Sequence, residues 1–308
     1  MGIDEKLKLF KEAMTSQYAG IVFDIDGTLT VFGEEIIPAF AAETLARIST
    51  EVPVAVCTAR TLRHALEAIT PVFARSSNPN YCKRNWYLFC ENGGIGYAFN
   101  DDKNDYEEIY RVLYPYTEEQ RQGMFSRLKD SVKELCGESK TNEISMVFKP
   151  ANKYTAPLEE VQKTCHQMAE ILKGKLQMID AKNALRIGDS GTGVDIYPYN
   201  GDKLTGVKAF AKILQEKRGI NLGEKLTELV LIGDSVQNNG NDTVFLSGEI
   251  GTPFCVGEIG PNANYPLPVF DLSDNSILKG PEGTIYLVNN LKFRIGANCQ
   301  YPSGSGSS

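Results

Sequence analysis

The sequence predicts an α/β protein in which a doubly wound parallel sheet is interrupted by an α+β insertion. Near both ends of the chain, short apolar runs that end in polar or glycine-rich turns alternate with amphipathic helix patterns. The stretch between them, residues 96–199, has longer helix patterns and aromatic, acidic loops. A chain of 308 residues also exceeds what one hydrophobic core usually supports, which favours a second module.

The first core segment covers residues 1–95. A charged amphipathic helix is expected at its start, and another helix at Pro38–Ser49. A further helix begins near Thr58. Three apolar runs with β-branched or aromatic content predict buried parallel strands between these helices. The predicted strands are Tyr18–Phe23, Val52–Cys57 and Trp86–Cys90.

The insertion, residues 96–199, is predicted to contain two long helices interleaved with short strands. The helix patterns cover Glu118–Cys136 and Pro157–Lys173, and the strand-like runs include Ile144–Phe148 and Val194–Tyr197. A second Gly-Asp-Ser occurs here, at Gly188–Ser190, after a weaker apolar run, and is interpreted as a turn.

The alternating core pattern resumes over residues 200–302, so the core is expected to be split around the insertion. Residues 303–308, SGSGSS, are expected to be a flexible tail without fold information. The predicted elements of this second core segment are a helix at Val207–Lys217, a strand at Leu229–Ile232, another at Phe254–Val256 and a closing helix at Gly283–Leu291.

Composition excludes several classes of partner and site. The net charge of −7 gives no broad basic surface for nucleic acid or anionic lipid. No run approaches the ~18 apolar residues of a membrane helix. The seven cysteines are scattered and only two histidines are present, so neither a disulfide framework nor a structural zinc site is expected. We expect a cytoplasmic protein without nucleic-acid or membrane partners, and the oligomeric state is left open.

The chemical signal with most weight is VFDIDGTLT, residues 22–30, at the end of the first core strand. The carboxyl ends of parallel strands form the ligand crevice of an open sheet. Asp24 and Asp26, two residues apart, can project to the same side there, and two carboxylates together favour a bound Mg²⁺. Asp24 could attack phosphorus while Asp26 acts as acid and then base. Gly27 permits the sharp turn whose exposed amides can hold phosphate oxygens.

This motif resembles the first motif of the haloacid dehalogenase superfamily, and the other motifs follow in order. Thr58 and Ala59 in VAVCTAR resemble the phosphoryl-binding second motif, and Lys203 in DIYPYNGDK resembles the basic residue beside the nucleophile. Asp234 in GDSVQNNGND resembles the acidic metal-binding motif. The resemblance implies Mg²⁺ held by Asp24, Asp234 and the Asp26 backbone carbonyl. It also implies that the insertion is a cap domain.

Several residues near these motifs have two interpretations. Asn241 and Asp242 are expected to support the metal or Lys203, and Glu91 with Asn92 to be a loop stabiliser or to orient the cap or substrate hydroxyls. Lys208 competes with Lys203 for the phosphate. Surface salt bridges are the expectation for Arg60 and Arg63, and solvated positions for Lys149 and Lys153. His64 and His166 are expected to be non-catalytic.

The leading functional prediction is a magnesium-dependent phosphatase that acts on a small phosphate ester through an aspartyl-phosphate on Asp24. The large cap resembles that of sugar phosphatases, whereas the spacing in GDSVQNNGND and the run DIYPYNGDK resemble eukaryotic-type phosphomannomutases. Both resemblances imply a sugar phosphate as the substrate. A phosphohexose mutase is the nearest alternative. A non-catalytic protein that binds a phosphorylated metabolite is a third.

Overall fold

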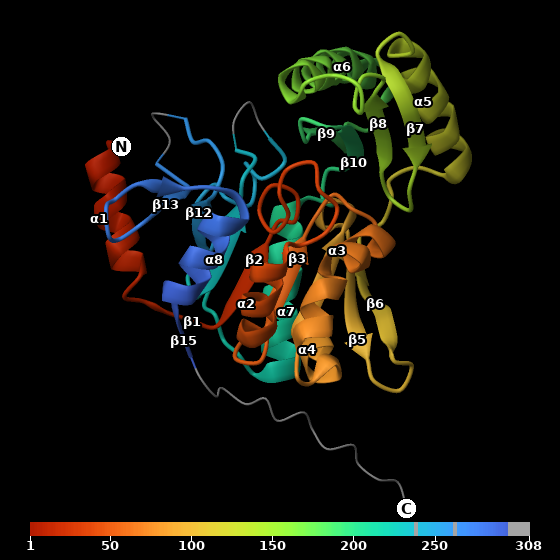
Figure 1. Cartoon of the computed structure of the whole chain (residues 1–308). Coiled ribbons are helices and arrows are strands. Elements are labelled where there is room, and N and C mark those ends of the chain that lie inside the picture. The colour runs from red at the N-terminus through yellow and green to blue at the C-terminus, as the bar shows by residue number, and fades with distance from the viewer. Residues whose placement is uncertain (237–239, 261–263, 295–308) are drawn as a thin grey trace, which may run out of the picture.

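The computed structural model describes residues 1–236, 240–260 and 264–294. The predicted tail at 303–308 and three residues of the GDSVQNNGND motif, 237–239, lie outside the described residues. A nine-stranded sheet forms the core and a four-stranded sheet forms a separate upper layer, as Figure 1 shows. The predicted fold class, a parallel-sheet core with an inserted α+β cap, is confirmed.

Six parallel strands make up the centre of the core sheet, in the spatial order β13-β12-β11-β2-β3-β4. The strands β3 and β4 extend the sheet in one direction from β2, and β12 and β13 extend it in the other direction from β11. The pair β2–β11 is therefore the switch point of the topology, where open α/β sheets bind ligands. The strands are β2 (Gly20–Phe23), β3 (Val54–Cys57), β4 (Trp86–Cys90), β11 (Leu229–Gly233), β12 (Thr252–Cys255) and β13 (Leu267–Phe270).

Antiparallel strands extend both edges of this sheet: β5 (Ile95–Asn100) and β6 (Asp105–Arg111) beside β4, and β14 (Ile277–Leu278) beside β13. The hairpin β5–β6 corrects the expected boundary, which places residues 96–111 in the cap. The strand β6 is mostly exposed or half-buried and contains the acidic residues Asp105, Glu107 and Glu108, so no apolar run marks this continuation of the core.

Helices cover both faces of the core sheet, and the alternation of side chains along β2 shows how. Ile21 and Phe23 pack in one apolar cluster with residues of α1, α2, α3 and α8, whereas Val22 packs with α7 in a second cluster. Figure 1 shows α2 and α8 in front of the sheet and α7 behind it. These helices are α1 (Ile3–Ala13), α2 (Ala39–Ile48), α3 (Leu62–Arg75), α4 (Pro79–Asn85), α7 (Lys203–Arg218) and α8 (Gly280–Asn290).

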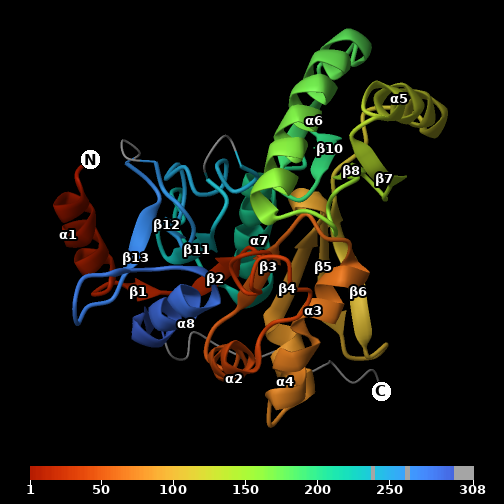
Figure 2. The same ribbon diagram turned by 45° about the horizontal axis from the view of Figure 1, so that its top comes forward.

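The cap is an antiparallel sheet in the order β7-β8-β10-β9, with two helices packed on one face. The views in Figures 1 and 2 place it above the edge where the parallel core strands end. Its apolar centre includes Leu128, Phe148, Leu172 and Ile196, all fully buried. The elements are α5 (Glu118–Ser131), β7 (Cys136–Thr141), β8 (Met146–Pro150), α6 (Leu158–Ile179), β9 (Leu185–Asp189) and β10 (Val194–Pro198).

Some predicted boundaries differ from the structure. The first strand divides into β1 (Gln17–Tyr18), which pairs with β15 (Lys292–Phe293), and β2 in the core sheet. The helix expected near Thr58 begins only at Leu62. The cap copy of Gly-Asp-Ser is not a simple turn, because its first two residues end β9 and pair with β10.

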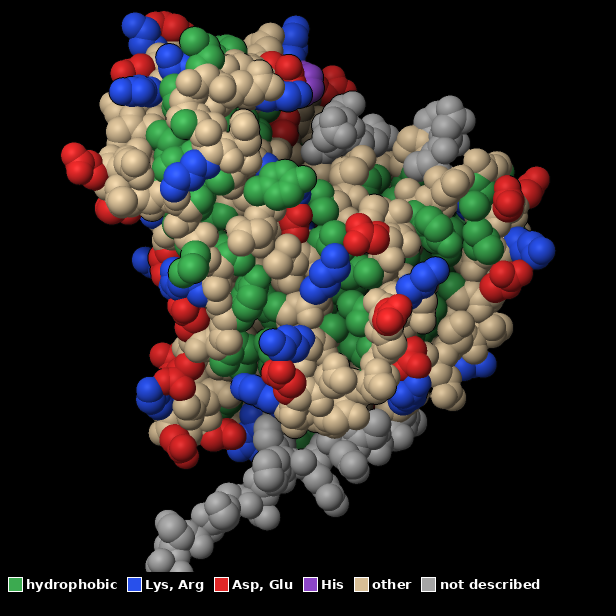
Figure 3. Space-filling view, turned by 180° about the vertical axis from the view of Figure 1, so that it is seen from behind, with side chains coloured by type: hydrophobic (Ala, Val, Ile, Leu, Met, Phe, Trp, Pro, Cys, Tyr) green, Lys and Arg blue, Asp and Glu red, His purple; other side chains and the backbone are tan. Residues whose placement is uncertain are grey.

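The surface view in Figure 3 shows lysines, arginines and acidic side chains interspersed over the face opposite to that of Figure 1. None of the helices in the part of the chain that the structure describes has the length and apolar character needed to cross a bilayer.

Candidate active site

The predicted site residues follow neighbouring core strands. Asp24 comes directly after β2, Thr58 after β3, Glu91 after β4 and Asp234 after β11. Because these strands are parallel and adjacent, their carboxyl ends share the edge that faces the cap in Figure 1. The backbone holds Asp24 in register with β11, since its amide donates to the Ile232 carbonyl at 2.8 Å. The topology therefore gathers chain segments as far apart in sequence as Asp24 and Asp234.

Lys203 lies between two carboxylates at this edge. Its Nζ is 2.7 Å from Oδ1 of Asp24 and 2.5 Å from Oδ1 of Asp242, and all three residues are buried. Lys203 is the first residue of α7, capped by Asp202, whose carboxylate accepts the Thr205 amide. The ion pairs fix the ammonium beside the proposed nucleophile. The rival Lys208 lies on the surface, 3.3 Å from Glu249.

Asp242 holds the loop after β11 in place. Its Oδ2 accepts hydrogen bonds from the amides of Asp234 and Ser235, both at 2.9 Å, while its Oδ1 contacts Lys203. Both oxygens are thus occupied by the protein. Asn241, expected to be a neighbouring support, lies against the cap instead, with its Cβ 3.8 Å from where a Cβ on Gly188 would stand.

Asp24, Asp234 and Asp242 each offer a carboxylate oxygen within 4.8 Å of the others, a spacing that a single cation can bridge. The Asp242 oxygens are already engaged, so Asp24 and Asp234 are the ligands with capacity for a metal. Thr28 orients Asp234 by donating to its Oδ1 at 3.2 Å. Gly27 has φ of +76°, and a Cβ there would lie 2.4 Å from Asp234 Oδ2, so only glycine fits beside this carboxylate.

The electrostatics of the cluster fit a cation. Three clustered carboxylates, two of them buried and paired with Lys203, have this single ammonium as their nearby counter-charge. Burial raises the pKa of Asp24 to about 7, although the attraction of Lys203 opposes the rise. Burial and the nearby charges of Asp242 and Asp24 raise the pKa of Asp234 as well. A hard divalent cation with oxygen preference would offset this repulsion, and the donor set suits Mg²⁺.

Asp26 is held by a residue that the sequence interpretation assigned to the surface. Nη2 and Nε of Arg60 bond the two Asp26 oxygens at 2.7 and 3.1 Å, and the Arg60 side chain is only 14% exposed. The paired, planar geometry is characteristic of arginine and fixes the carboxylate in one orientation. The expectation of a surface salt bridge for Arg60 is wrong. One sequence feature could have indicated that Arg60 belongs to the site: it lies two residues after Thr58, before α3 begins.

Thr58 and Ala59 form the turn between β3 and α3. Thr58 is buried, its amide donates to the Phe89 carbonyl at 2.9 Å, and its hydroxyl accepts the Arg60 amide at 3.2 Å. Ala59 is half-buried in the same turn. The turn thus connects the proposed phosphate-binding hydroxyl to the arginine that holds Asp26.

Glu91 and Asn92 connect the core to the cap. Both are buried and have positive φ values, 49° and 62°, in the 3₁₀ turn η1 (Glu91–Gly93). The Glu91 carboxylate accepts the amides of Glu143 and Ile144, at 3.0 and 2.9 Å, and the Ser145 hydroxyl at 2.9 Å. Three donors from the cap on one core carboxylate make Glu91 an anchor for the cap segment 143–145. Strained backbone of this kind persists only where contacts fix it.

Asp195 on β10 was not singled out from the sequence. It is buried on the side of β10 opposite to Val194 and Ile196, which belong to the apolar centre of the cap. Burial raises its pKa to about 7, and the charges of Glu91 and Asp26 act in the same direction. A buried acid between other acids favours its neutral form.

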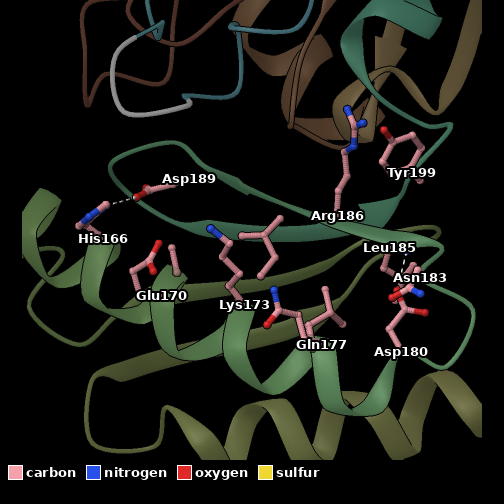
Figure 4. Close-up of a pocket in the computed structure, with 13 residues that line it drawn as sticks. His166, Glu170, Lys173, Gln177, Asp180, Asn183, Leu185, Arg186, Asp189 and Tyr199 are labelled. Carbon is pink, nitrogen blue, oxygen red and sulfur yellow. Dashed lines mark hydrogen bonds and ion pairs between the residues drawn. The ribbon is translucent and has the colours of Figure 1, made fainter.

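A separate hollow of about 330 Å³ lies in the cap between α6 and β9. Figure 4 shows side chains of α6, such as Glu170 and Lys173, directed toward the strand, and His166 beside Asp189. The Nδ1 of His166 is 3.8 Å from Oδ2 of Asp189. Asp189 of the cap copy of Gly-Asp-Ser lines this hollow, and the residues around Asp24 do not.

Comparison with known proteins shows similarity at the level of structure. No protein-family model and no curated protein matches the sequence. An IMP-bound variant of the IMP-nucleotidase of Plasmodium falciparum superposes with a TM-score of 0.64 and 15% identity, over 93% of this chain and 72% of that one. An N-terminally truncated form of that enzyme gives 0.61 and 15%, over 92% and 73%. Its ATP-bound form gives 0.59 and 16%, over 76% and 57%. This chain therefore has the fold of these nucleotidase structures, which is the capped fold that the haloacid dehalogenase resemblance predicts.

Proposed function

We propose that the protein is a magnesium-dependent phosphatase that hydrolyses a small phosphate ester through an aspartyl-phosphate on Asp24. The observation that carries the proposal is the cluster at the switch point, where Asp24 contacts Lys203 and shares a possible cation position with Asp234. The fold shared with a nucleotidase supports this reaction class.

The side chains have distinct roles in the proposed reaction. Asp24 attacks phosphorus, and Lys203 balances negative charge beside it. Asp26, oriented by Arg60, protonates the leaving oxygen and later takes a proton from the water that hydrolyses the aspartyl-phosphate. Thr58 offers its hydroxyl to a phosphoryl oxygen. Asp24, Asp234 and the Asp26 carbonyl would hold Mg²⁺, which would supply positive charge to stabilise the transferring phosphoryl group.

The proposed substrate is a phosphate ester of a sugar hydroxyl. The sequence resemblance favours a sugar phosphate, and the IMP in the similar structure is itself an ester of a ribose. A nucleoside monophosphate and a simple sugar phosphate are therefore both members of the proposed class. We propose a cytoplasmic location, consistent with the scattered cysteines. Neither nucleic acid nor a membrane is proposed as a partner.

The cap bears on the choice between phosphatase and mutase, because a mutase needs a second site for a phosphate. Lys149, one of the two cap lysines expected to be solvated, is paired with Glu138 at 3.0 Å. Lys153 lies near it, with its Nζ 5.5 Å from the Tyr154 ring. A paired lysine and one neighbour make a weak grip for a dianion, so hydrolysis is favoured.

A screen for release of inorganic phosphate tests the proposal. Purified protein would be given Mg²⁺ and a panel of sugar phosphates and nucleoside monophosphates, with the Asp24→Asn variant as the matched control. We expect release that needs Mg²⁺ and is lost in the variant, which differs by one atom and should stay folded. Turnover by Asp24→Asn would show that the nucleophile is wrong. Isomerisation of a hexose phosphate that a bisphosphate primes would favour the mutase, and no turnover of any ester would favour a binding protein.

A further inference from the structure

The cap sheet carries its helices on one face only, and its other face, called the open face below, is turned toward the catalytic edge. Met146 and Phe148 of β8 pack among the helices, so Val147 and Lys149, which alternate with them, lie on the open face. Asp195 pairs with Val147 and therefore lies there too. Its pKa is raised by burial and then by acids of the core, so the open face is the one above the catalytic edge.

The charged side chains of β7 and β8 on the open face have partners or point elsewhere. Glu138 of β7 is opposite Lys149 in the register, and its Oε2 is 3.0 Å from the Lys149 Nζ. The other charged side chain of these two strands, Lys140, lies toward α3, since its charge adds to the effect of burial in lowering the pKa of His64. Lys149 thus has a carboxylate of its own.

A further cap lysine, Lys153, lies in the loop 151–157 that connects β8 to α6. In Figure 2 the start of α6, which follows this loop, is the end of the helix that lies nearer to the core sheet. The Lys153 side chain is half-buried, and its pKa is lowered by burial first and by the charge of Lys149 next. The charges of Asp26 and Glu138 oppose that lowering. The ammonium of Lys153 is therefore within electrostatic range of Asp26, across the gap between cap and core.

Neither of these two acids is available to Lys153 as a partner. Glu138 contacts Lys149, and both oxygens of Asp26 are bonded by Arg60. Among the residues that the structure describes, no carboxylate forms an ion pair with Lys153, and the segments outside them contain neither aspartate nor glutamate. The positive charge of this half-buried ammonium is therefore free to meet an anionic group of a ligand.

The gap between Asp26 and Lys153 is where the leaving group of the proposed reaction lies. Asp26 protonates the leaving oxygen, so the rest of that group has to extend from Asp26 away from the nucleophile Asp24. The Asp26 side chain is 46% exposed although Arg60 bonds both of its oxygens, so the leaving group can reach it from the gap. The phosphoryl site and Lys153 thus meet opposite ends of the substrate.

We propose that the substrate is a phosphate ester whose leaving group carries one carboxylate, and that Lys153 binds this carboxylate. The inference rests on the proposed phosphatase function, which gives the position of the leaving group. The ion pairs on either side of the gap cancel, so the ammonium of Lys153 is the charge that remains for the leaving group. One ammonium matches one carboxylate, whereas a phosphate dianion calls for a second cation. Phosphate esters of sugar acids are the class of substrate that fits.

Three esters that share one phosphate and differ only at the far end of the sugar test the inference: glucose 1-phosphate, glucuronic acid 1-phosphate and glucose 1,6-bisphosphate. Their far ends are a hydroxymethyl group, a carboxylate and a phosphate. Calorimetry would measure their binding to Asp24→Asn protein in the presence of Mg²⁺, because the ester persists when the proposed nucleophile is absent. We expect glucuronic acid 1-phosphate to bind at least about tenfold more tightly than glucose 1-phosphate, and the bisphosphate no more tightly than the acid.

Variants made in the same background show whether Lys153 causes the preference. Lys153→Met should reduce it to less than about threefold, whereas Lys153→Arg, which keeps the charge, should retain most of it. Lys163→Met removes an exposed lysine of α6 and is the matched control, which should bind all three esters as the parent does. Because Lys153→Met gives up no ion pair, its thermal midpoint should stay within about two degrees of the parent, which separates lost binding from lost folding.

Equal affinity for glucose 1-phosphate and glucuronic acid 1-phosphate, or a preference that survives in Lys153→Met, would overturn the inference. A bisphosphate that binds more tightly than the acid through Lys153 would overturn the carboxylate and favour the mutase.

Phosphate release by the wild type separates this inference from the proposed function. Equal release from glucose 1-phosphate and glucuronic acid 1-phosphate would keep the phosphatase and overturn the carboxylate preference. Binding that depends on Lys153, without release of phosphate from any ester, would support the carboxylate site and overturn the phosphatase.

Discussion

The tripeptide Gly-Asp-Ser occurs once in the core and once in the cap, and the two copies have different surroundings. In the core, Asp234 directly follows a fully buried parallel strand and lies near Asp24, with Thr28 donating to its carboxylate. In the cap, Asp189 ends an edge strand, accepts the Gly191 amide at 2.8 Å and faces His166. Identical residues thus acquire different chemistry from the strand that carries them and from the groups opposite.

The same comparison shows how the two regions touch. Asp189 forms an isolated parallel bridge with Gly240, in the loop that follows Asp234. The cap copy is therefore a neighbour of the core copy without sharing its carboxylate cluster. Proximity to the site alone does not make an aspartate a metal ligand.

The proposed difference between Asp234 and Asp189 is tested most directly by neutralising each aspartate in turn. Asp234→Asn removes one of the two carboxylates with capacity for a cation, so we expect phosphatase turnover to fall more than about 100-fold and the Mg²⁺ requirement to rise. Asp189→Asn is the matched control and should change turnover less than about threefold. The measurement is phosphate release over a Mg²⁺ titration.

Equal losses in the two variants would contradict this assignment. They would mean that the cap copy takes part in the chemistry through its bridge to Gly240. Circular dichroism of both variants is needed, so that a folding defect is not counted as a catalytic one.

A second contrast compares Lys203, between two buried carboxylates, with the exposed Lys208. Lys203→Met leaves Asp24 and Asp242 without their counter-ion, and breaking a buried pair from one side typically costs about 3–5 kcal/mol. Lys208→Met breaks only a surface pair and should cost less than about 1 kcal/mol. Urea unfolding in the presence of a chelator measures both, and similar midpoints for the two variants would contradict the burial argument.

Much of the core could be predicted from local sequence patterns, whereas the contacts between the cap and the core could not. The strand Trp86–Cys90 was predicted with its observed bounds because a continuous apolar run between turns has few alternatives. The gathering of Asp24, Lys203 and Asp234 was predicted from strand ends and motif order. The paired hydrogen bonds of Arg60 were missed, since a charged residue near a helix start is usually solvated and only the fold brings Asp26 against it.

The cap was harder to predict from the sequence for a physical reason. Every residue of the strand β7 is exposed or half-buried and most are polar, so no apolar run marks it. Asp195 follows a valine and precedes an isoleucine in a strand pattern, and its burial depends on the core surface beneath the cap. Contacts between two separately formed units leave little signal in either segment.

Asp195, a buried acid of the cap, allows the core and the cap to be compared by the pH dependence of stability. Its folded-state pKa of about 7 lies above the ordinary 3.8, so the protonated form contributes stability that is full below about pH 4 and is lost as pH rises through 7. We expect Asp195→Asn to be more stable than the wild type at pH 8, on the order of 3 kcal/mol, and the difference to shrink toward pH 4. Urea unfolding at several pH values measures this.

The exposed Asp102→Asn variant is the control for this pH series and should follow the wild type throughout. If Asp195→Asn were less stable than the wild type at pH 8, the carboxylate would be ionised and favourably paired. In that case Asp195, like Asp24, would have a counter-ion, and the two acids would not differ in this respect.

The smallest expected effect concerns the link between the two regions. Glu91→Gln replaces one accepting oxygen by an amide that faces the donors of the cap segment 143–145, so unfolding should be easier by about 1–2 kcal/mol. Hydrogen exchange of the Ile144 amide should accelerate about tenfold, because its acceptor is weakened. Glu143→Gln, which changes only an exposed carboxylate paired with Arg111, is the matched control. If exchange accelerates equally in both variants, Glu91 is not the anchor, and the cap is held by its edge contact at Gly240 instead.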